Sequence, residues 1–77
     1  MDTIKEFVLA FADTFDETPI ETFTADTAFH ELDDWSSING LAILDMIKRR
    51  YGVKLSPHEL RNAVTVNDVY NLILSKE

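Results

Sequence analysis

Apolar residues recur at helical spacing in separate stretches of this chain, and that periodicity constrains its fold more than any other feature. Between residues 3 and 15, apolar residues at spacings of three and four define one face of a helix: Ile4, Phe7, Val8, Phe11 and Phe15. Asp2 or Thr3 is expected to cap its first amides. A second helix is expected to begin at Ser36-Ser37, with a core face formed by Ile38, Leu41, Leu44, Ile47 and Tyr51 and widened by Ile43.

Capping residues mark the end of the second helix and the start of two more. Gly52, preceded by a basic last turn at residues 48–50, ends the second helix. The segment Ser56-Pro57-His58-Glu59 is a capping box that opens a short helix through about Asn62. Residues 65–68 open a fourth helix, whose apolar face is Val66, Val69, Tyr70 and Ile73. Residues 53–55 alternate like a strand but are too few to build a sheet, so the sequence predicts an all-α, four-helix domain.

A long loop is predicted between the first two helices. The helical periodicity disappears from residue 16 to residue 34, where turn-forming residues stand instead: Thr18-Pro19, Thr22, Thr24, Asp26 and Thr27. A free loop of this length is unusual in a compact domain. We therefore expect Phe23, Phe29 and Leu32 to pin the loop to the core.

Length and charge exclude several classes of function. A chain of 77 residues is expected to form one domain, residues 1–77, with little room for an enclosed catalytic cleft. The net charge of −7 argues against nucleic acid or an anionic membrane as the main partner and favours a basic protein surface. No apolar run is long enough to span a bilayer and the first residues do not resemble a signal peptide, so we expect a cytoplasmic protein without stable membrane insertion.

The residues that usually carry catalysis or bind metals are absent or unsuitably spaced. The chain has no Cys, which excludes disulfides, thiolate zinc sites and a thiol nucleophile. His30 and His58 lack partners at metal-ligand spacing, and the acidic residues near position 33 do not fit a calcium loop. Ser36-Ser37 lacks the flanking glycines of a hydrolase elbow. We therefore predict no catalytic residue and no metal site, and by itself this serine pair suggests a helix N-cap.

Several short motifs stand in a fixed register with this serine pair. Residues 32–41 read Leu-Asp-Asp-Trp-Ser-Ser-Ile-Asn-Gly-Leu. An aliphatic residue directly follows Ser37, and Tyr51-Gly52-Val53 stands at the end of the second helix. The other motifs are the loop residues Thr24, Thr27 and Phe29, the segment Leu55-Ser56-Pro57, and the segment Val64-Thr65-Val66-Asn67-Asp68. With the apolar positions Leu41, Ile43, Leu44 and Ile47, this register resembles an acyl carrier protein of the bacterial freestanding type over nearly the whole chain.

The resemblance implies both a fold and a function. The fold is a four-helix bundle of acyl-carrier-protein type, with a long loop between helices one and two and a short third helix. The function is to carry acyl intermediates as thioesters on a covalent 4′-phosphopantetheine arm, derived from coenzyme A, to fatty acid or polyketide-type biosynthetic enzymes. The register places the arm on Ser37, because attachment to Ser36 would shift every core position by one. Ser36 is then a cap or a neighbour.

The resemblance also implies partners and a docking surface. The partners are a phosphopantetheinyl transferase, an acyltransferase or adenylating loading enzyme, and condensing and tailoring enzymes. A monomer is expected, because a carrier must visit several active sites in turn. The expected docking residues are Trp35, Ser36, Ile38, Asn39, Ala42, Asp45 and Met46. The expected walls for a sequestered acyl chain are Ile43, Met46, Ile47, Leu55, Leu60 and Ala63.

Two departures from the family pattern refine this prediction. The usual Asp before the modified serine is replaced by Ser36, and Asp33 and Asp34 are expected to supply the local charge. The second helix holds only Asp45 as an acidic residue, whereas fatty-acid-type carriers keep this helix acidic. The charge is also split, with −10 in residues 1–47 and +3 in residues 48–77. We hypothesise a dedicated pathway whose enzymes read a less acidic helix and are basic near Ser37.

Two alternative functions remain at this stage. One is an aminoacyl or peptidyl carrier of a nonribosomal peptide pathway, because sequence pattern separates the two kinds of cargo poorly. The other is an unmodified helical protein-interaction module, in which Ser37 is only part of a helix start.

Overall fold

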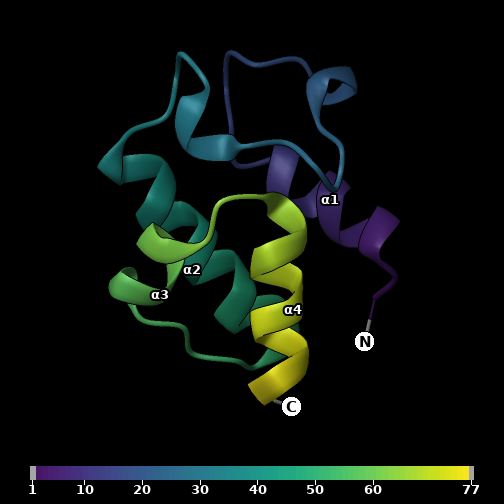
Figure 1. Ribbon diagram of the computed structural model, residues 1–77, viewed down its shortest axis with the longest axis vertical. Helices are drawn as coiled ribbons and strands as arrows, with labels where there is room; N and C mark the ends of the chain where they lie inside the picture. Colours follow the sequence, from purple (N-terminus) through teal and green to yellow (C-terminus); the bar gives the residue numbers. More distant parts are fainter. Residues whose placement is uncertain (1, 77) are drawn as a thin grey trace.

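The computed structural model describes residues 2–76 as four α-helices and two short 3-10 helices (Figure 1). The elements are α1 (Ile4–Ala12), η1 (Ile20–Thr22), η2 (Phe29–Glu31), α2 (Ser37–Tyr51), α3 (Pro57–Asn62) and α4 (Val66–Lys76). No strand occurs within residues 2–76, and no helix in that range is long and apolar enough to cross a bilayer. The predicted all-α fold, with its long loop and short third helix, is confirmed.

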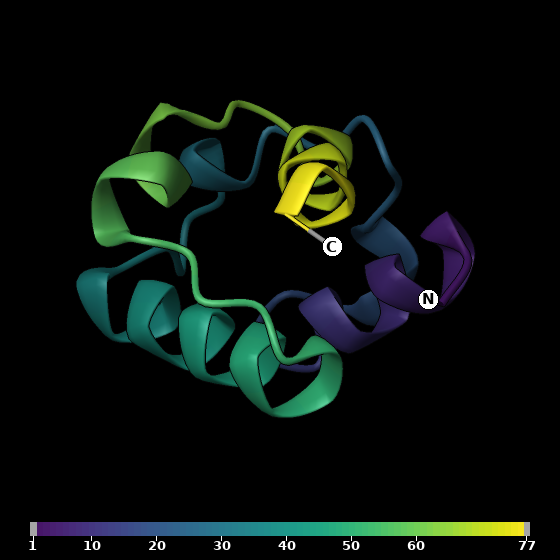
Figure 2. The ribbon, with the colours of Figure 1, turned by 90° about the horizontal axis from the view of Figure 1, so that it is seen from below.

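The helices pack around one apolar core. Helix α1 packs against α2 and α4, and α2 packs against α3. Viewed nearly along α4, α2 runs across the opposite side of the molecule, with α3 and α1 on either side (Figure 2). The largest fully buried side chains come from α1, the loop, α2 and α4: Phe7, Phe11, Phe29, Ile43, Ile47, Val66, Val69 and Ile73.

The predicted helix boundaries are largely confirmed. Thr3 caps α1 in a reciprocal capping box with Glu6, and Ser56 caps α3 with Glu59 in the same way. Gly52 ends α2 with a φ of 69°, a conformation that favours glycine. The expectation that the first helix continues to Phe15 is wrong. Residues 14 and 15 donate to carbonyls only three residues earlier, so the chain tightens into a turn after Ala12.

The long loop between α1 and α2 is fixed to the core by aromatic packing, as predicted. Phe23 and Phe29 are buried and Leu32 is half-buried. The ring of Phe11 in α1 lies 5.0 Å from that of Phe29 and 6.4 Å from that of Phe23, measured between centroids. The loop thereby covers one end of the bundle, at the top of Figure 1.

The loop also supplies acceptors for the start of α4. The Val66 N–H donates to the Thr27 carbonyl at 3.2 Å, and the Asn67 N–H donates to the Ala25 carbonyl at 2.9 Å. The first amides of a helix have no partner within the helix. The loop therefore completes the N-terminus of α4.

The face that α2 turns to the core matches the predicted one at Ile43 and Ile47 and differs from it at two positions. Gly40, Ile43 and Ile47 are buried, whereas Ile38 is 78% exposed and Leu41 is 65% exposed. The predicted core position of Leu41, and that of Ile38, is therefore wrong. Apolar residues occupy more than one side of this helix, and the stripe that includes the small Gly40 allows the closest packing. A Cβ atom on Gly40 would lie 3.4 Å from the Trp35 ring.

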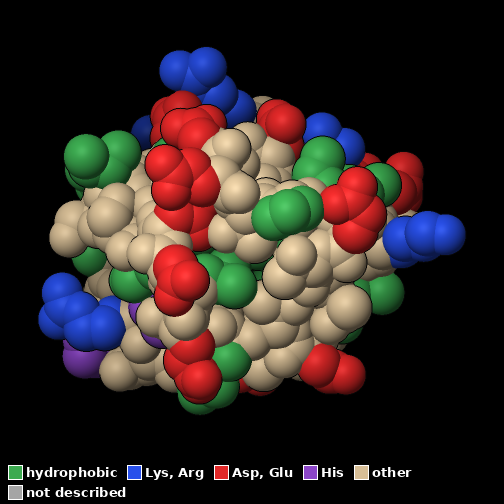
Figure 3. Space-filling model, turned by 90° about the horizontal axis from the view of Figure 1, so that it is seen from above, with side chains coloured by type: hydrophobic (Ala, Val, Ile, Leu, Met, Phe, Trp, Pro, Cys, Tyr) green, Lys and Arg blue, Asp and Glu red, His purple; other side chains and the backbone are tan. Residues whose placement is uncertain are grey.

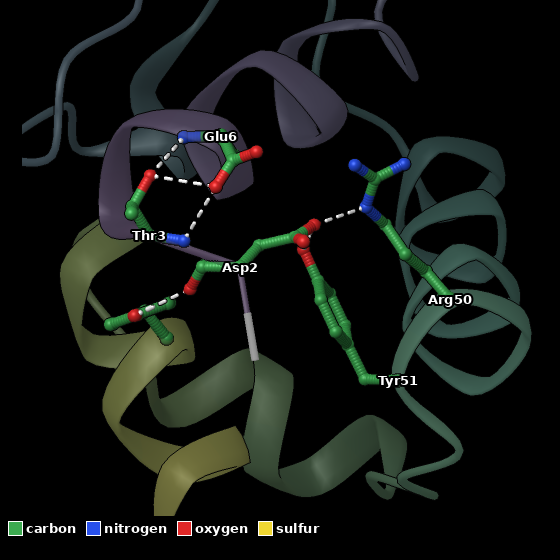
Figure 4. A network of polar contacts seen from close by, with 6 residues as sticks. Asp2, Thr3, Glu6, Arg50 and Tyr51 are labelled. Atoms are coloured by element: carbon green, nitrogen blue, oxygen red, sulfur yellow. Dashed lines mark hydrogen bonds and ion pairs between the residues drawn. The ribbon is translucent and has the colours of Figure 1, made fainter.

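A polar network ties the start of the chain to α2 and α4 (Figure 4). The Asp2 carboxylate accepts hydrogen bonds from Arg50 Nε at 2.6 Å and from the Tyr51 hydroxyl at 3.0 Å. The Tyr70 hydroxyl donates to the Asp2 carbonyl at 2.7 Å. The hydrogen bond from Arg50 lowers the pKa of Asp2 below its usual 3.8. Burial, reinforced by the bond to Asp2, raises the pKa of Tyr51 to about 12.

Replacing Asp2 by Asn removes the charge from this network and is expected to lower the melting temperature by a few degrees at pH 7. The folded-state pKa of Asp2 is lowered, so its contribution is fully present above pH 3.8 and is lost as the pH falls through the folded value. The difference between wild type and Asp2→Asn should therefore shrink when melting is followed by circular dichroism at pH 3. The control is Asp26→Asn, because the Asp26 carboxylate is exposed. Equal effects of the two substitutions at pH 7 would contradict the role of the network.

Candidate functional site

The two serines at the start of α2 have different environments. Ser36 is the N-cap, and its hydroxyl donates to Asn39 Oδ1 at 2.7 Å and accepts from the Asn39 N–H at 3.4 Å. Ser37 is the first helical residue and is exposed. Within residues 2–76 no group forms a hydrogen bond with the Ser37 hydroxyl. Both serines are exposed, and of the two hydroxyls it is that of Ser36 which is held by hydrogen bonds within residues 2–76.

The start of α2 suits a negatively charged group. The helix is 15 residues long and has no acidic residue in its first turn. Its first backbone N–H groups point out of the helix and give this end a partial positive charge. A phosphodiester on Ser37 would lie beside these donors, so the residues present fit a phosphate-linked arm.

Asp34, which was expected to supply negative charge near Ser37, is used within the loop. Its carboxylate accepts from the Glu17 and Thr18 N–H groups, each at 3.2 Å, and from the Thr18 hydroxyl. The Thr18 hydroxyl contributes most to lowering the pKa of Asp34, followed by the two backbone donors. Asp34 therefore holds the two ends of the loop together as a carboxylate, and Asp33 beside it is exposed.

Trp35 forms a wall beside the two serines. Its ring contacts Phe29 edge-on, with 5.4 Å between centroids, and lies 4.6 Å from the ring of His30. His30 Nε2 in turn lies 3.2 Å from the Leu60 carbonyl, which can only accept, so Nε2 carries the proton. Trp35 is thus half-buried and connects the loop with α2 and α3.

A hollow of about 310 Å³ lies between α2, α3 and the loop, and we call it the α3-side hollow. Ser37 stands at this hollow, whose apolar lining includes Trp35, Leu41, Leu44 and Leu60. His30 and Arg61 add polar groups to the lining. The sequence positions of His30 and Arg61 gave no indication that both lie at this hollow beside Ser37, because that proximity arises from packing of the loop on α3.

The predicted acyl-chain walls mostly lie elsewhere. Among them, only Leu60 lines the α3-side hollow. Met46 is half-buried against the core, and the others are buried within it: Ile43, Ile47, Leu55 and Ala63. The sequence identified apolar residues correctly but could not separate the core from the lining of a surface hollow.

A second hollow of about 650 Å³ lies on the other flank of α2, and we call it the loop-side hollow. Four loop carboxylates line it, those of Asp16, Glu17, Asp33 and Asp34. The start of α2 contributes Ile38 and Ala42. Trp35 lines both hollows and separates them.

The predicted docking residues occupy different environments around these hollows. Ser36, Ile38, Ala42 and Asp45 are exposed, and Asp45 pairs with Arg49 at 3.0 Å. Asn39 is half-buried and donates to the Thr14 carbonyl at 3.5 Å. Trp35 and Met46 are also half-buried. Within residues 2–76, no group of three or more metal-ligating side chains is placed to hold an ion.

Replacing Ser36 by Ala removes the N-cap of α2 and is expected to lower the free energy of unfolding by about 1 kcal/mol. Urea denaturation followed by circular dichroism measures the change. Ser37→Ala is the matched control and should stay within about 0.5 kcal/mol of wild type, as exposed positions usually do. A larger loss for Ser37→Ala than for Ser36→Ala would overturn the assignment of the cap.

The comparison with known families agrees with this geometry. A family model described as a phosphopantetheine attachment site matches residues 5–73, a span that includes both serines, all of α2 and all of α3. No curated protein and no solved structure gives a significant match to the chain. The match confirms the relationship that the register around Ser37 predicted. The chain therefore belongs to the family of phosphopantetheine attachment domains, and its prosthetic group is 4′-phosphopantetheine.

Proposed function

We propose that this protein is a non-catalytic acyl carrier protein that bears 4′-phosphopantetheine on Ser37. The contrast between the two serines is the observation that supports this assignment. The Ser37 hydroxyl is exposed at the start of a long helix, whereas the Ser36 hydroxyl is held by Asn39 as the helix cap. Modification of Ser36 would remove that cap, whereas modification of Ser37 leaves it intact.

The attachment step requires only a nucleophilic oxygen from this chain. Ser37 Oγ forms a bond to the phosphorus that bears the pantetheine unit of coenzyme A. The bond from that phosphorus to the adenosine bisphosphate breaks, and the hydroxyl proton passes to a base of the phosphopantetheinyl transferase. When bound, the group supplies a thiol that holds cargo as a thioester. Tethering then raises the concentration of the cargo at each enzyme that docks the carrier.

The α3-side hollow supports acyl cargo rather than aminoacyl cargo. Leu41, Leu44 and Leu60 give it an apolar lining next to Ser37. Burial of an apolar chain contributes about 0.8 kcal/mol for each CH₂ group removed from water, whereas an aminoacyl group brings a charged amine that is costly to desolvate. The proposed users are therefore fatty acid or polyketide-type enzymes, namely an acyltransferase and condensing and tailoring enzymes.

The surface of α2 supports a dedicated pathway rather than general fatty acid synthesis. Asp45 is the one acidic residue in α2, and it pairs with Arg49. Enzymes that recognise an acidic second helix would find little negative charge there. We place the carrier in the cytoplasm as a monomeric single domain, docking its enzymes through residues around Ser37 and along the exposed side of α2.

Incubation with coenzyme A and a promiscuous phosphopantetheinyl transferase is expected to add one phosphopantetheine unit, seen by intact-protein mass spectrometry. Ser37→Ala should abolish the gain in mass, because it removes the accepting oxygen. Ser36→Ala is the matched control and should still be loaded. Loading of Ser37→Ala but not of Ser36→Ala would reverse the assignment. No loading by several transferases would exclude the carrier function and favour an unmodified interaction module.

Loading with octanoyl-coenzyme A is expected to change the fluorescence of Trp35, the one Trp of the chain, because this ring lines the α3-side hollow. Loading with coenzyme A itself or with an aminoacyl-coenzyme A should leave the emission near that of the unmodified protein. Leu41→Gln, which makes the lining polar at an exposed position, should reduce the octanoyl effect. A larger response to the aminoacyl group than to octanoyl would favour the peptidyl carrier instead.

A further inference from the structure

The exposed face at the start of α2 is apolar and offers no uncompensated negative charge. Ile38 and Leu41 are 78% and 65% exposed, on the first two turns beside Ser37. Isolated exposed apolar residues are common, but here two lie one turn apart next to the proposed modification site. The single carboxylate of the helix, Asp45, is compensated by Arg49. A partner that reaches Ser37 along this face meets apolar contacts first.

Negative charge lies beside this face, on the loop. Residues 13–36 contain eight acidic side chains and no Lys or Arg. Figure 3 looks onto this end of the molecule and shows Asp and Glu side chains in a band across it, with Lys and Arg toward the outline. Asp16, Glu17 and Asp33 direct part of this charge into the loop-side hollow, where they meet Ile38 and Ala42.

Among the residues that the structure describes, none forms an ion pair with these three carboxylates. No salt bridge within residues 2–76 involves Asp16, Glu17 or Asp33, and all three are exposed. By contrast, Asp34, which also lines the hollow, accepts hydrogen bonds from Glu17 and Thr18. Like charges that line the same hollow repel one another, and a cationic side chain placed among them relieves that repulsion.

We propose that the loop-side hollow takes up Lys or Arg side chains of the phosphopantetheinyl transferase while Ile38 provides the adjoining apolar contact. In this chain the loop, rather than α2, then supplies the negative charge that orients the enzyme toward Ser37. The inference rests on the proposed function of Ser37. The hollow includes Ser36 and Ile38, the two neighbours of Ser37, so an enzyme acting on that hydroxyl necessarily reaches its rim.

Other occupants fit this hollow less well. A second copy of the chain would bring the same acidic loop against itself, and an anionic membrane or a nucleic acid would be repelled. A small apolar ligand would leave three carboxylates unpaired beside it. The charge and the apolar contact together match a basic protein surface with an exposed apolar side chain.

The test compares two triple variants that remove the same charge from the same loop. Asp16→Asn/Glu17→Gln/Asp33→Asn removes the three exposed carboxylates of the hollow and leaves Asp34 in place, whereas Glu21→Gln/Asp26→Asn/Glu31→Gln removes three exposed carboxylates outside it. Transferase loading is followed by mass spectrometry at about 0.01 M and 0.15 M salt, where the screening length falls from about 30 Å to about 8 Å. Circular dichroism confirms that both variants are folded.

The hollow variant is expected to lose about 10-fold in kcat/KM at low salt, mainly through a higher KM, because electrostatic steering changes association rates on the order of 10-fold or more. The control variant is expected to lose about 2-fold in kcat/KM. The difference in kcat/KM between the two variants should become smaller at the higher salt concentration. Equal losses of kcat/KM in the two variants would show that only the overall charge matters and would overturn the proposal. No loss in either variant would exclude the hollow as a docking site for the transferase. Wild type that is not loaded at all would overturn the proposed function, a result distinct from both.

Discussion

The aromatic contacts around Phe11 are the constraint on which the rest of this structure depends. This one ring, fully buried in α1, lies within 6.4 Å of the rings of Phe7, Phe15, Phe23 and Phe29. The Phe29 ring in turn contacts the ring of Trp35, which lies just before α2. Packed aromatic pairs contribute about 0.5–1.5 kcal/mol each beyond the area they bury. A chain this short cannot build a larger core, and this series of aromatic contacts takes its place. The series also fixes the positions of Ser36 and Ser37 at the end of the loop.

How far the sequence predicted the structure depended on whether the determining contacts were local. Helix starts at Thr3, Ser36 and Ser56 were predictable, because a capping side chain and the backbone N–H that donates to it lie within four residues of each other. The core face of α2 was predictable only in part, since Ile43 and Ile47 are buried as expected but Ile38 and Leu41 are exposed. Apolar residues occupy more than one side of this helix, and packing against Trp35 and Leu60 selects the side with Gly40. The position of His30 beside α3 depends on a contact across thirty residues of chain, which no local spacing encodes.

For the candidate site, too, features set by local contacts were predictable and features set by long-range contacts were not. The register of short motifs singled out Ser37 over Ser36, and the local hydrogen bonds of Ser36 provide an independent physical reason for that choice. The two hollows that flank the start of α2 were beyond prediction, because each combines residues from at least two elements that are distant in sequence. Trp35 was predicted as a docking residue, and the structure shows that its half-buried ring lines both hollows. The hollow on one side of it is apolar with Arg61, and the hollow on the other side is acidic.

The hydrogen bonds from the loop to the start of α4 have a consequence for local opening of the fold. The amides of Val66 and Asn67 are satisfied by the Thr27 and Ala25 carbonyls rather than by the helix itself. Their hydrogen exchange with solvent therefore requires the loop to lift, even while α4 stays helical. The exchange rate of these two amides measures directly how often the segment that leads to Ser37 leaves the body of the protein.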